Sequence, residues 1–416
     1  MTINRRKEDI MATGYHRIIM KIVLTGSLFF LGSSSVHAGV LVQCPGDADG
    51  SATWTGAEVQ PAHTKCMHLG AGDGFVTMAD GKLQYVFGFS DLTGIAANTP
   101  TGTAEILEAG TTAAGFPAPL IVLDEGDEFY LTLTNIGMSM RPDLFDPHTV
   151  HFHGFPQAAS IFDGVPDASI SINMGSSLTY YFKLNNPGTY MYHCHVEAAE
   201  HMQMGMLGSL YVRAAQNGTV FNYNGKDFNK FAYNDGDGST GYDLEYPIQI
   251  GSFDSAFHDA NLAVQPLPFA TMFDNYSMLN GRGYPDTVNP NPLPPPAENG
   301  GKLSQIESTL ITASPGESVL LRISNLNVTR MNTLATLGIP MRVIGKDAKQ
   351  LRGPDGKNLY YKTNSITVGG GESYDVILDI PAGASGKTYF LYTTQLHYLS
   401  NDAEQFGGMM TEIRIN

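Results

Sequence analysis

Six of the twelve histidines fall in two short segments, and one of the three cysteines lies inside the second of them. The two segments contain His148, His151 and His153, and then His193, Cys194, His195 and His201. Imidazole and thiolate groups are typical ligands of transition metals. Successive side chains of a β-strand point to opposite faces, so Cys194 faces away from both of its histidine neighbours. One strand can therefore supply a sulfur ligand to one metal and imidazoles to another, joined by the covalent path through Cys194.

The types of these side chains favour copper. Two imidazoles, one thiolate and a weak axial thioether form a blue-copper electron-transfer site. Cys194 would provide the thiolate, and His148 and His201 the imidazoles. We prefer Met206 as the axial ligand, because its step from His201 resembles the His-x-x-x-Gly-Met ending of known copper sites. Two nearby methionines are rivals for the axial position, Met202 and Met204.

Several segments resemble a known family. They are residues 147–154 (PHTVHFHG), 163–166 (DGVP) and 188–195 (GTYMYHCH), which resemble the copper motifs of the multicopper oxidases, the laccase-like family. Residues 117–213 are similar to the copper-binding cupredoxin domain of that family. Residues 279–283 (LNGRG) and the strands expected over 314–393 are more loosely similar to its copper-free middle domain.

The resemblance implies copper ligands and an activity. The residues that it implies for a type 1 copper are His148, Cys194, His201 and Met206. The residues that it implies for a catalytic cluster are His151 for a type 2 copper, and His153, His193 and His195 for a binuclear type 3 pair. The expected enzyme is an oxidoreductase that takes electrons from a small molecule, a metal ion or a redox protein at the type 1 copper. The cluster would pass those electrons to oxygen.

The supply of histidines departs from the family pattern. The multicopper oxidases assemble a trinuclear cluster from eight histidines, four on each of two facing domains, whereas the second half of this chain contains only His258 and His397. His397 follows a late strand, roughly where copper nitrite reductases take a ligand from a neighbouring subunit, and a surface-loop role fits it equally well. We interpret His258 as a polar loop residue. A second chain would have to contribute ligands, which predicts a homo-oligomer such as a trimer and leaves the copper count open.

Two other functions stay open at this point. Copper nitrite reductases share the expected domain count and part of the histidine spacing. They usually have an aspartate, which passes protons to nitrite, where this chain has His151, and they lack a histidine directly after the cysteine. His151 and His195 therefore favour a copper cluster and oxygen reduction over nitrite reduction. A non-catalytic blue-copper electron carrier is the second alternative.

The elements that must position these residues are strands. Alternating segments are expected over residues 119–135, 177–184, 189–194 and 208–213, with Gly, Pro and Asn at the turns between them. Further strands are expected in the second half, and no stretch shows sustained helical periodicity. The pattern predicts an all-β chain, and with the resemblance two Greek-key cupredoxin-like β-sandwich domains. The expected parts are an extension with first strands (39–110), a copper-binding domain (111–213), a linker (214–245) and a second domain (246–416).

The beginning of the chain and its cysteines indicate export. Lys21, the apolar run over residues 22–31 and Val36-His37-Ala38 form a signal-peptide pattern over residues 1–38, with translation starting at Met1 or Met20. The expected location is periplasmic or extracellular, with no membrane span. Cys44 and Cys66 can pair as a disulfide there, which leaves Cys194 free for a metal. His63 and His68 flank Cys66 and could bind metal. We interpret their segment as part of a disulfide loop.

The net charge of the chain limits the classes of partner that we expect it to bind. Forty acidic against twenty-four basic residues give a formal net charge of -16, which argues against nucleic acid as a partner. Such a surface favours a cation, a metal ion or a basic redox protein.

Overall fold

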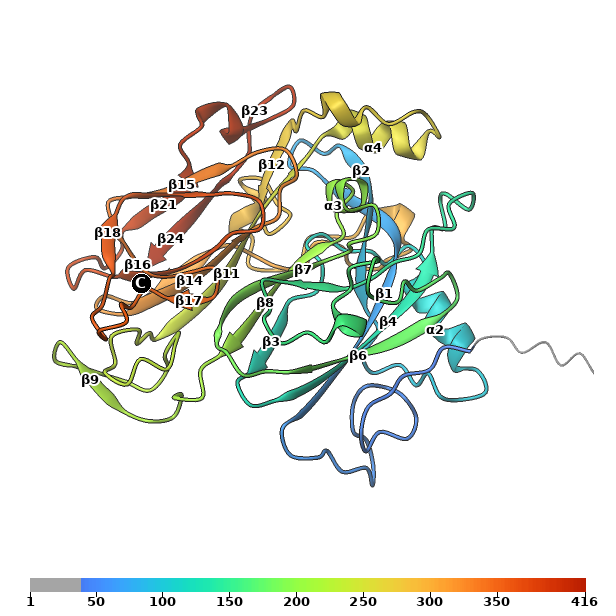
Figure 1. Cartoon of the computed structure of the whole chain (residues 1–416). Helices are drawn as coiled ribbons and strands as arrows, with labels where there is room; N and C mark the ends of the chain where they lie inside the picture. Colours follow the sequence, from blue (N-terminus) through green and yellow to red (C-terminus); the bar gives the residue numbers. More distant parts are fainter. Residues whose placement is uncertain (1–38) are drawn as a thin grey trace, which may run out of the picture. The chain divides into compact units, whose positions relative to one another are not determined.

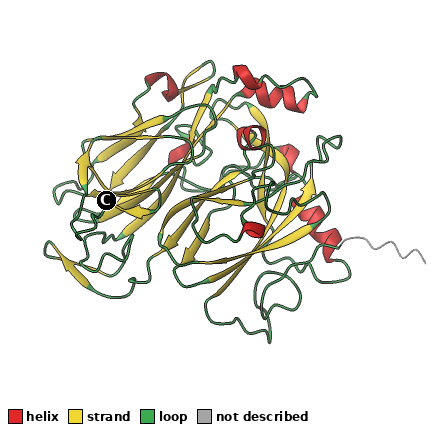
Figure 2. Cartoon of the chain, in the orientation of Figure 1, coloured by secondary structure: helices red, strands yellow, loops and turns green. Residues whose placement is uncertain are grey.

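Strands dominate residues 39–416, the part of the chain that the computed structural model describes (Figures 1 and 2). The predicted signal peptide over residues 1–38 lies outside the described residues. Most strands belong to four larger sheets, which pair into two β-sandwiches. The all-β prediction is confirmed.

The first sandwich is built from two four-stranded sheets. One sheet has the order β2-β1-β4-β6 and the other the order β3-β8-β7-β5. The strands of the first sheet are β1 (Thr64–Thr77), β2 (Leu83–Asp91), β4 (Glu128–Gly137) and β6 (Ser177–Lys183). Those of the second are β3 (Ile121–Asp124), β5 (His151–His153), β7 (Gly188–His193) and β8 (Leu207–Arg213). A turn at Gly126, with φ at +96°, divides the expected segment over residues 119–135 into β3 and β4. The two strands enter different sheets, and β3 pairs in parallel with β8.

The second sandwich has larger sheets. One has the order β12-β11-β14-β20-β16-β17 with β18 also on β16, and the other the order β13-β24-β21-β15-β19. The strands of the first sheet are β11 (Leu244–Phe253), β12 (Tyr276–Leu279), β14 (Ser318–Asn325), β16 (Met341–Lys346), β17 (Lys349–Gln350), β18 (Tyr361–Thr363) and β20 (Ser373–Asp379). Those of the second are β13 (Ile311–Ala313), β15 (Asn332–Leu337), β19 (Ser365–Val368), β21 (Thr388–Thr393) and β24 (Met410–Ile415). Two short hairpins lie outside these sheets, β9 (Phe221–Tyr223) with β10 (Lys226–Phe228) and β22 (Ser400–Asn401) with β23 (Glu404–Gly407).

Within residues 39–416 three short α-helices interrupt the strands, although the sequence shows no sustained helical pattern. They are α2 (Gly102–Gly110), α3 (Ala198–Gln203) and α4 (Ser255–Leu262). Helix α4 has a clear local cause, because Asp254 caps it by accepting hydrogen bonds from the backbone N–H groups of Ala256 and Phe257. Five short 3-10 helices complete the described elements: η1 (Ser160–Phe162), η2 (Phe269–Thr271), η3 (Asp286–Val288), η4 (Ala297–Asn299) and η5 (Leu396–Leu399).

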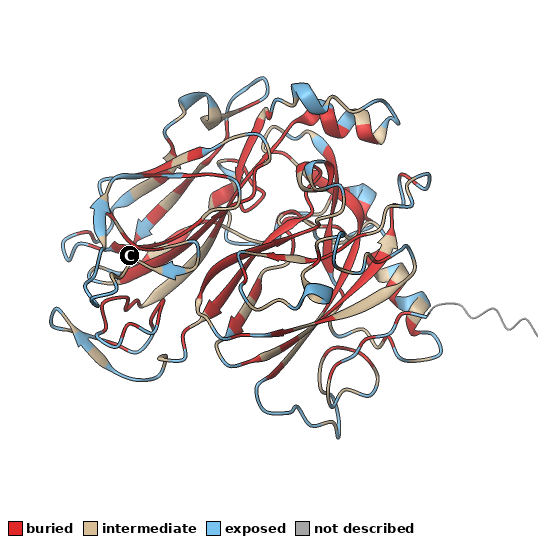
Figure 3. Cartoon of the chain, viewed as in Figure 1, coloured by how far each residue is buried: buried red, intermediate tan, exposed pale blue. Residues whose placement is uncertain are grey.

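Each sandwich closes around its own apolar core, and a third cluster joins the two. The strands are buried along most of their length, as Figure 3 shows. The joining cluster includes Met191 and Leu207 of the first sandwich and Phe253, Tyr276 and Leu326 of the second. Burying such side chains stabilises the contact by about 25 cal/mol per Å² of apolar area. The two sandwiches therefore hold each other in a defined position, which matters because one cavity lies between them.

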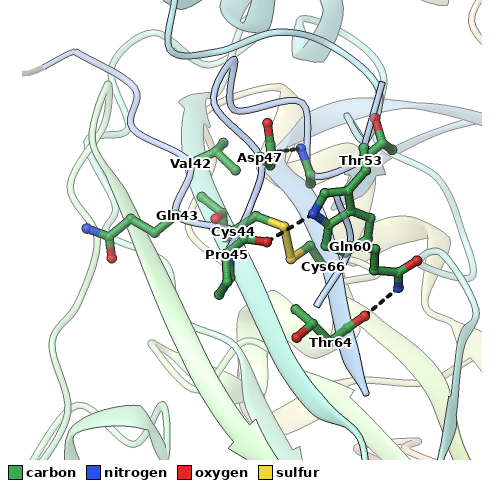
Figure 4. Close-up of a disulfide and its surroundings, with 12 residues drawn as sticks. Val42, Gln43, Cys44, Pro45, Asp47, Thr53, Gln60, Thr64 and Cys66 are labelled. Atoms are coloured by element: carbon green, nitrogen blue, oxygen red, sulfur yellow. Dashed lines mark hydrogen bonds between the residues drawn. A yellow bond between two sulfur atoms is a disulfide. The ribbon is translucent and has the colours of Figure 1, made fainter. Parts of the chain in front are cut away.

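A disulfide and a hydrogen bond attach the extension before β1 to the first sandwich. Cys44 and Cys66 form the predicted disulfide, with their Cα atoms 6.0 Å apart (Figure 4). The backbone N–H of Leu41 also donates to Ser177 Oγ of β6 at 2.9 Å. Within residues 39–416, no helix combines the length and the apolar character needed to cross a membrane.

Candidate copper centres

The pairing of β5 with β7 brings the two histidine segments together. His151 lies opposite His193 in this antiparallel pair, and His153 lies opposite Met191. The ring centroids of His151 and His193 are 5.3 Å apart, and those of His153 and His193 are 5.5 Å apart. His195, just past the end of β7, has its ring 5.2 Å from that of His151. The four side chains therefore form one cluster, which we call the four-histidine cluster.

Cys194 points to the other side of the strand, as the alternation requires. Its Sγ lies 3.8 Å from His148 Nδ1 and 3.3 Å from His201 Nδ1, and all three residues are fully buried. Short helix α3 carries His201 to this position. The backbone N–H of Cys194 donates to the carbonyl oxygen of Met206 at 3.1 Å, so the end of the ligand loop is tied to the cysteine. We call this second group the cysteine site.

The donor set of the cysteine site fits copper. One ligand atom each from His148, Cys194 and His201 lies within 4.8 Å of the others, so the three can reach one ion. A thiolate with two imidazoles is the ligand set of blue copper. The methionines differ in placement: Met204 and Met206 are fully buried in the core around Cys194, whereas Met202 lines the cavity over the four-histidine cluster. Met206 remains our proposed axial ligand, with Met204 as its rival.

The charges around Cys194 favour the metal-binding form of its thiol. Burial alone would raise the pKa of Cys194, but the charge of His201 and hydrogen bonds from His148 and His201 bring that pKa well below its ordinary value. The thiolate is the form that binds metals.

Hydrogen bonds orient the rings of the four-histidine cluster. His193 Nδ1 lies 2.8 Å from the carbonyl oxygen of Cys194, and His151 Nδ1 lies 2.5 Å from that of Asp163. Each ring therefore donates from Nδ1 and turns Nε2 toward the cluster, where His193 Nε2 lies 3.4 Å from His153 Nδ1. Such second partners of ligand rings are common around protein metal sites. The Asp163 carbonyl is presented by a turn in which Gly164 has φ of +77°, and a Cβ there would lie 2.2 Å from the oxygen of Val150. The DGVP segment thus serves the orientation of His151.

Burial favours the neutral form of two rings of the cluster, His193 and His153. It lowers the pKa of His193 to about 3, and the neighbouring imidazoles add to the shift. Burial also lowers the pKa of His153, again with a contribution from His151 and His195. Neutral imidazoles are the form that ligates metals.

A cavity of about 640 Å³ opens over the four-histidine cluster. The first sandwich contributes the four imidazoles to its wall, and the second contributes residues of two loops, 326–331 and 370–371. Gly371 allows the close approach of the second loop, because a Cβ at this position would lie 2.7 Å from His153 Nε2. Neither loop contains a histidine. The cavity wall therefore holds half of the eight imidazoles of a trinuclear cluster.

The other histidines of the described chain lie apart from both sites. His258 is not the loop residue that we expected from the sequence. It lies in α4, fully buried, with its ring nitrogens 2.6 Å from the carbonyl oxygen of Tyr85 and 2.9 Å from that of Gln203. His68 is buried in β1 at 2.7 Å from Thr134 Oγ1, whereas His63 and His397 are exposed.

Family comparisons agree with the two sites. Sequence models described as multicopper oxidase match residues 100–217 and residues 255–413. The chain belongs to the multicopper oxidase family. Members of this family are copper-dependent oxidoreductases, and the histidine and cysteine groups described above fit copper. The resemblance inferred from the sequence is confirmed.

Curated relatives match the chain over a limited segment. Multicopper oxidase MCE of Talaromyces pinophilus is 36% identical over 104 residues, which are 24% of this chain and 16% of that protein. Laccase abr2 of Aspergillus fumigatus is 38% identical over 104 residues, with the same two shares. Multicopper oxidase MmcO of Mycobacterium tuberculosis is 39% identical over 80 residues, 19% of this chain and 14% of that protein.

Solved structures match over most of the chain at low identity. A blue copper oxidase from Nitrosomonas europaea has a TM-score of 0.60 at 22% identity, covering 85% of this chain and 86% of that one. A copper nitrite reductase from Nitrosomonas europaea has a TM-score of 0.56 at 18% identity, covering 85% and 94%. At these identities the matches show the fold alone. They confirm two cupredoxin-like sandwiches.

Proposed function

We propose that this multicopper oxidase is an electron-transferring oxidoreductase with two copper centres in its first sandwich. The first centre uses His148, Cys194, His201 and Met206 as type 1 ligands. The second uses the four-histidine cluster, and oxygen is its electron acceptor. A small molecule, a reduced metal ion or a redox protein supplies the electrons, and the acidic chain favours a cationic donor.

The connection through Cys194 carries this proposal. Its Sγ meets two imidazoles on one side of β7, while its neighbours on both sides, His193 and His195, belong to the other cluster. Hydrogen bonding adds a second link, because His193 Nδ1 donates to the Cys194 carbonyl oxygen. An electron arriving at the cysteine site therefore needs to cross only a short covalent and hydrogen-bonded path.

The residues of the two sites perform different tasks. Full burial of Cys194, His148 and His201 excludes water from the cysteine site and fixes its geometry. The Asp163 carbonyl holds His151 with Nε2 free, and the cavity gives a small acceptor access to the four rings. Bound copper would supply one-electron redox chemistry at the first centre and activation of oxygen at the second.

Copper content, colour and turnover test the proposal together. The holoprotein should contain more than one copper per chain, absorb near roughly 600 nm as thiolate-bound copper does, and consume oxygen with phenolic or metal-ion donors. Cys194→Ser should lose the absorption and the oxygen uptake, whereas His63→Gln, which changes an exposed histidine, should keep both. A blue Cys194→Ser protein would refute the ligand assignment. Turnover with nitrite but not with oxygen would refute the acceptor.

Export and assembly are separate parts of the proposal. The Cys44–Cys66 disulfide supports an oxidising compartment, periplasmic or extracellular, which cell fractionation would test. A homo-oligomer such as a trimer would let a neighbouring chain complete the second centre. Light scattering on the holoprotein gives the oligomeric state, and His397→Gln tests a neighbour's histidine through the copper count.

A further inference from the structure

A second cleft, of about 490 Å³, lies between the first sandwich and a segment that leads into the second. The first sandwich contributes the end of β2, the end of α2 with the loop after it, and residues 117–120. The second half of the chain contributes side chains from residues 302–307. No residue that lines this cleft belongs to the four-histidine cluster or to the cysteine site. Clefts where two parts of a chain meet are common sites for small ligands.

Much of the cleft wall is apolar. Phe89 and Leu120 line it from the first sandwich, and Leu303 and Ile306 line it from the other segment. Leu303 is 44% exposed and Ile306 is 52% exposed, although both are large aliphatic side chains. An apolar group in the cleft would remove part of this surface from water, which favours binding.

The charged groups of the cleft favour a cation. Two carboxylates line it, those of Asp91 and Glu307, and among the lining residues within 39–416 the one basic residue is Lys302. The ammonium group of Lys302 donates to the carbonyl oxygens of Glu108 and Thr111 at the end of α2. It forms no ion pair with either carboxylate, so the lining residues leave the cleft with a negative charge to offer a ligand.

Glu307 is the more deeply placed of the two carboxylates. Within residues 39–416 its side chain has no hydrogen-bond or ion-pair partner. Burial raises the pKa of this carboxyl group, and the charge of Arg282 opposes the rise only in part. The guanidinium of Arg282 is itself engaged by the carbonyl oxygens of four residues: Asp286, Asn289, Gln305 and Ile306. Glu307 is therefore a half-buried negative charge that a ligand cation would stabilise.

A buried hydrogen-bond donor lies beyond Glu307. Four residues of the cleft also line a narrow cavity that reaches Gln249: Pro117, Ala118, Leu120 and Glu307. Gln249 is 2% exposed, and its Oε1 accepts from Ser209 Oγ at 3.0 Å. Its Nε2 is buried with no partner among residues 39–416, which is costly for an N–H group. A water molecule carried by a ligand ammonium group at Glu307 could accept from Nε2, so the inner end of the cleft suits a polar group.

We propose that this cleft binds a small primary ammonium ion with an apolar tail. The ammonium group lies at Glu307, and the tail packs against Leu303 and Ile306. The proposal goes beyond the proposed function, because it involves neither copper centre. Such a ligand contacts both halves of the chain and therefore stabilises the folded protein by binding to it.

Calorimetric titration of the copper-loaded protein tests the proposal. The two probes are phenethylammonium and phenethyl alcohol, which have nearly the same shape and differ in charge. The ammonium should bind with a dissociation constant below about 1 mM, and the alcohol at least about 10-fold more weakly. In Glu307→Gln the ammonium should lose at least about 10-fold in affinity while the alcohol changes by less than about twofold. Glu404→Gln removes an exposed carboxylate outside the cleft and should leave both affinities within about twofold.

A second variant covers the case in which Glu307→Gln does not fold. Leu303→Ser changes a partly exposed residue and should weaken both probes alike, by about 3-fold to 10-fold, because apolar contact is lost. The proposal is overturned if the wild type shows no saturable binding, if Glu307→Gln binds the ammonium as the wild type does, or if Leu303→Ser leaves both affinities unchanged. An amine bound to copper on the four histidines would give the second of these results. Failure of the copper assignments would leave the cleft proposal standing.

Discussion

The two sandwiches share an architecture and differ in what they do with buried polar groups. In the first, His148 Nε2 and His201 Nε2 are buried without hydrogen-bond partners, and their Nδ1 atoms surround a thiol. In the second, Arg322 is fully buried between two carboxylates, with Nε 3.0 Å from Glu245 Oε2 and Nη1 3.7 Å from Asp375 Oδ1.

The difference shows that the fold does not decide the chemistry. Both sandwiches are two packed sheets with an apolar core, yet only the first offers imidazole and thiolate groups at strand ends. In the second sandwich, buried polar groups form an ion network that also contacts the first sandwich. Thr189 of β7 donates to Asp375 Oδ1 at 2.5 Å, so the ion network reaches the strand that leads to Cys194. In our proposal the first sandwich binds the metal, and the second helps to hold the strand that leads to Cys194 in place.

Loss of a cluster histidine should separate the two copper centres and have the largest effect on activity. His151→Ala removes a ring from the middle of the four-histidine cluster but leaves the cysteine site intact. Oxygen uptake should fall by more than about 100-fold, while the blue absorption stays and the copper count drops. His63→Gln, in an exposed position, is the matched control. Full turnover by His151→Ala would show that oxygen is reduced elsewhere.

Removal of the buried arginine tests the structural role of the second sandwich. Arg322→Met leaves Asp375 without its cation in a buried position and Glu245 with Arg213 as its remaining cation, and should lower the free energy of unfolding by about 3–5 kcal/mol. Arg414→Met, at an exposed position, should change it by less than about 0.5 kcal/mol. Urea unfolding followed by circular dichroism gives both values. Equal stability of the two variants would contradict the role of the network.

The same variant should shift the response to acid. Burial would raise the pKa of Glu245, but Arg322 and Arg213 bring it below the ordinary glutamate value. A carboxyl group whose pKa is lower in the folded state adds stability above its unfolded pKa, and the stability is lost as the pH falls through the folded pKa. In Arg322→Met only Arg213 still opposes the burial effect on the Glu245 pKa, so acid unfolding should begin at a higher pH than in the wild type. The midpoint of an acid titration measures the difference.

Short-range features of both sites could be predicted from the sequence, and long-range ones could not. The alternation along β7 predicts that Cys194 and its neighbours face different clusters, because that relation depends only on adjacent residues. Nothing in the sequence indicated that Asn327 and Arg330, in the loop over residues 326–331, would line the cavity. That contact depends on how the second sandwich packs against the first. His258 was missed for the same reason: its partners Tyr85 and Gln203 are 173 and 55 residues away in the chain.

The disulfide tests whether the extension matters to the first sandwich. The two cysteines are 22 residues apart in the sequence. Closing a loop of that size lowers the entropy of the unfolded chain and so adds about 3 kcal/mol to the free energy of unfolding. Replacing Cys44 and Cys66 with serine should lower the thermal midpoint accordingly. The blue absorption of the folded variant should stay unchanged, because neither cysteine belongs to the cysteine site. If the folded variant lost its blue absorption at low temperature, the extension would be needed to maintain the geometry of the copper site.

The smallest expected effect is at His258, where the second half of the chain contacts the ligand helix of the first. Its ring joins the carbonyl oxygen of Tyr85 to that of Gln203, two residues after His201. His258→Phe keeps a ring but removes both polar contacts, and should lower the free energy of unfolding by about 1–2 kcal/mol. Because α3 then loses an anchor near His201, the reduction potential of the blue copper should shift while its absorption remains. His63→Phe, at an exposed position, is the control for adding an aromatic ring elsewhere. If only stability changes in His258→Phe, the residue supports the fold, and the second sandwich positions the copper site through its ion network alone.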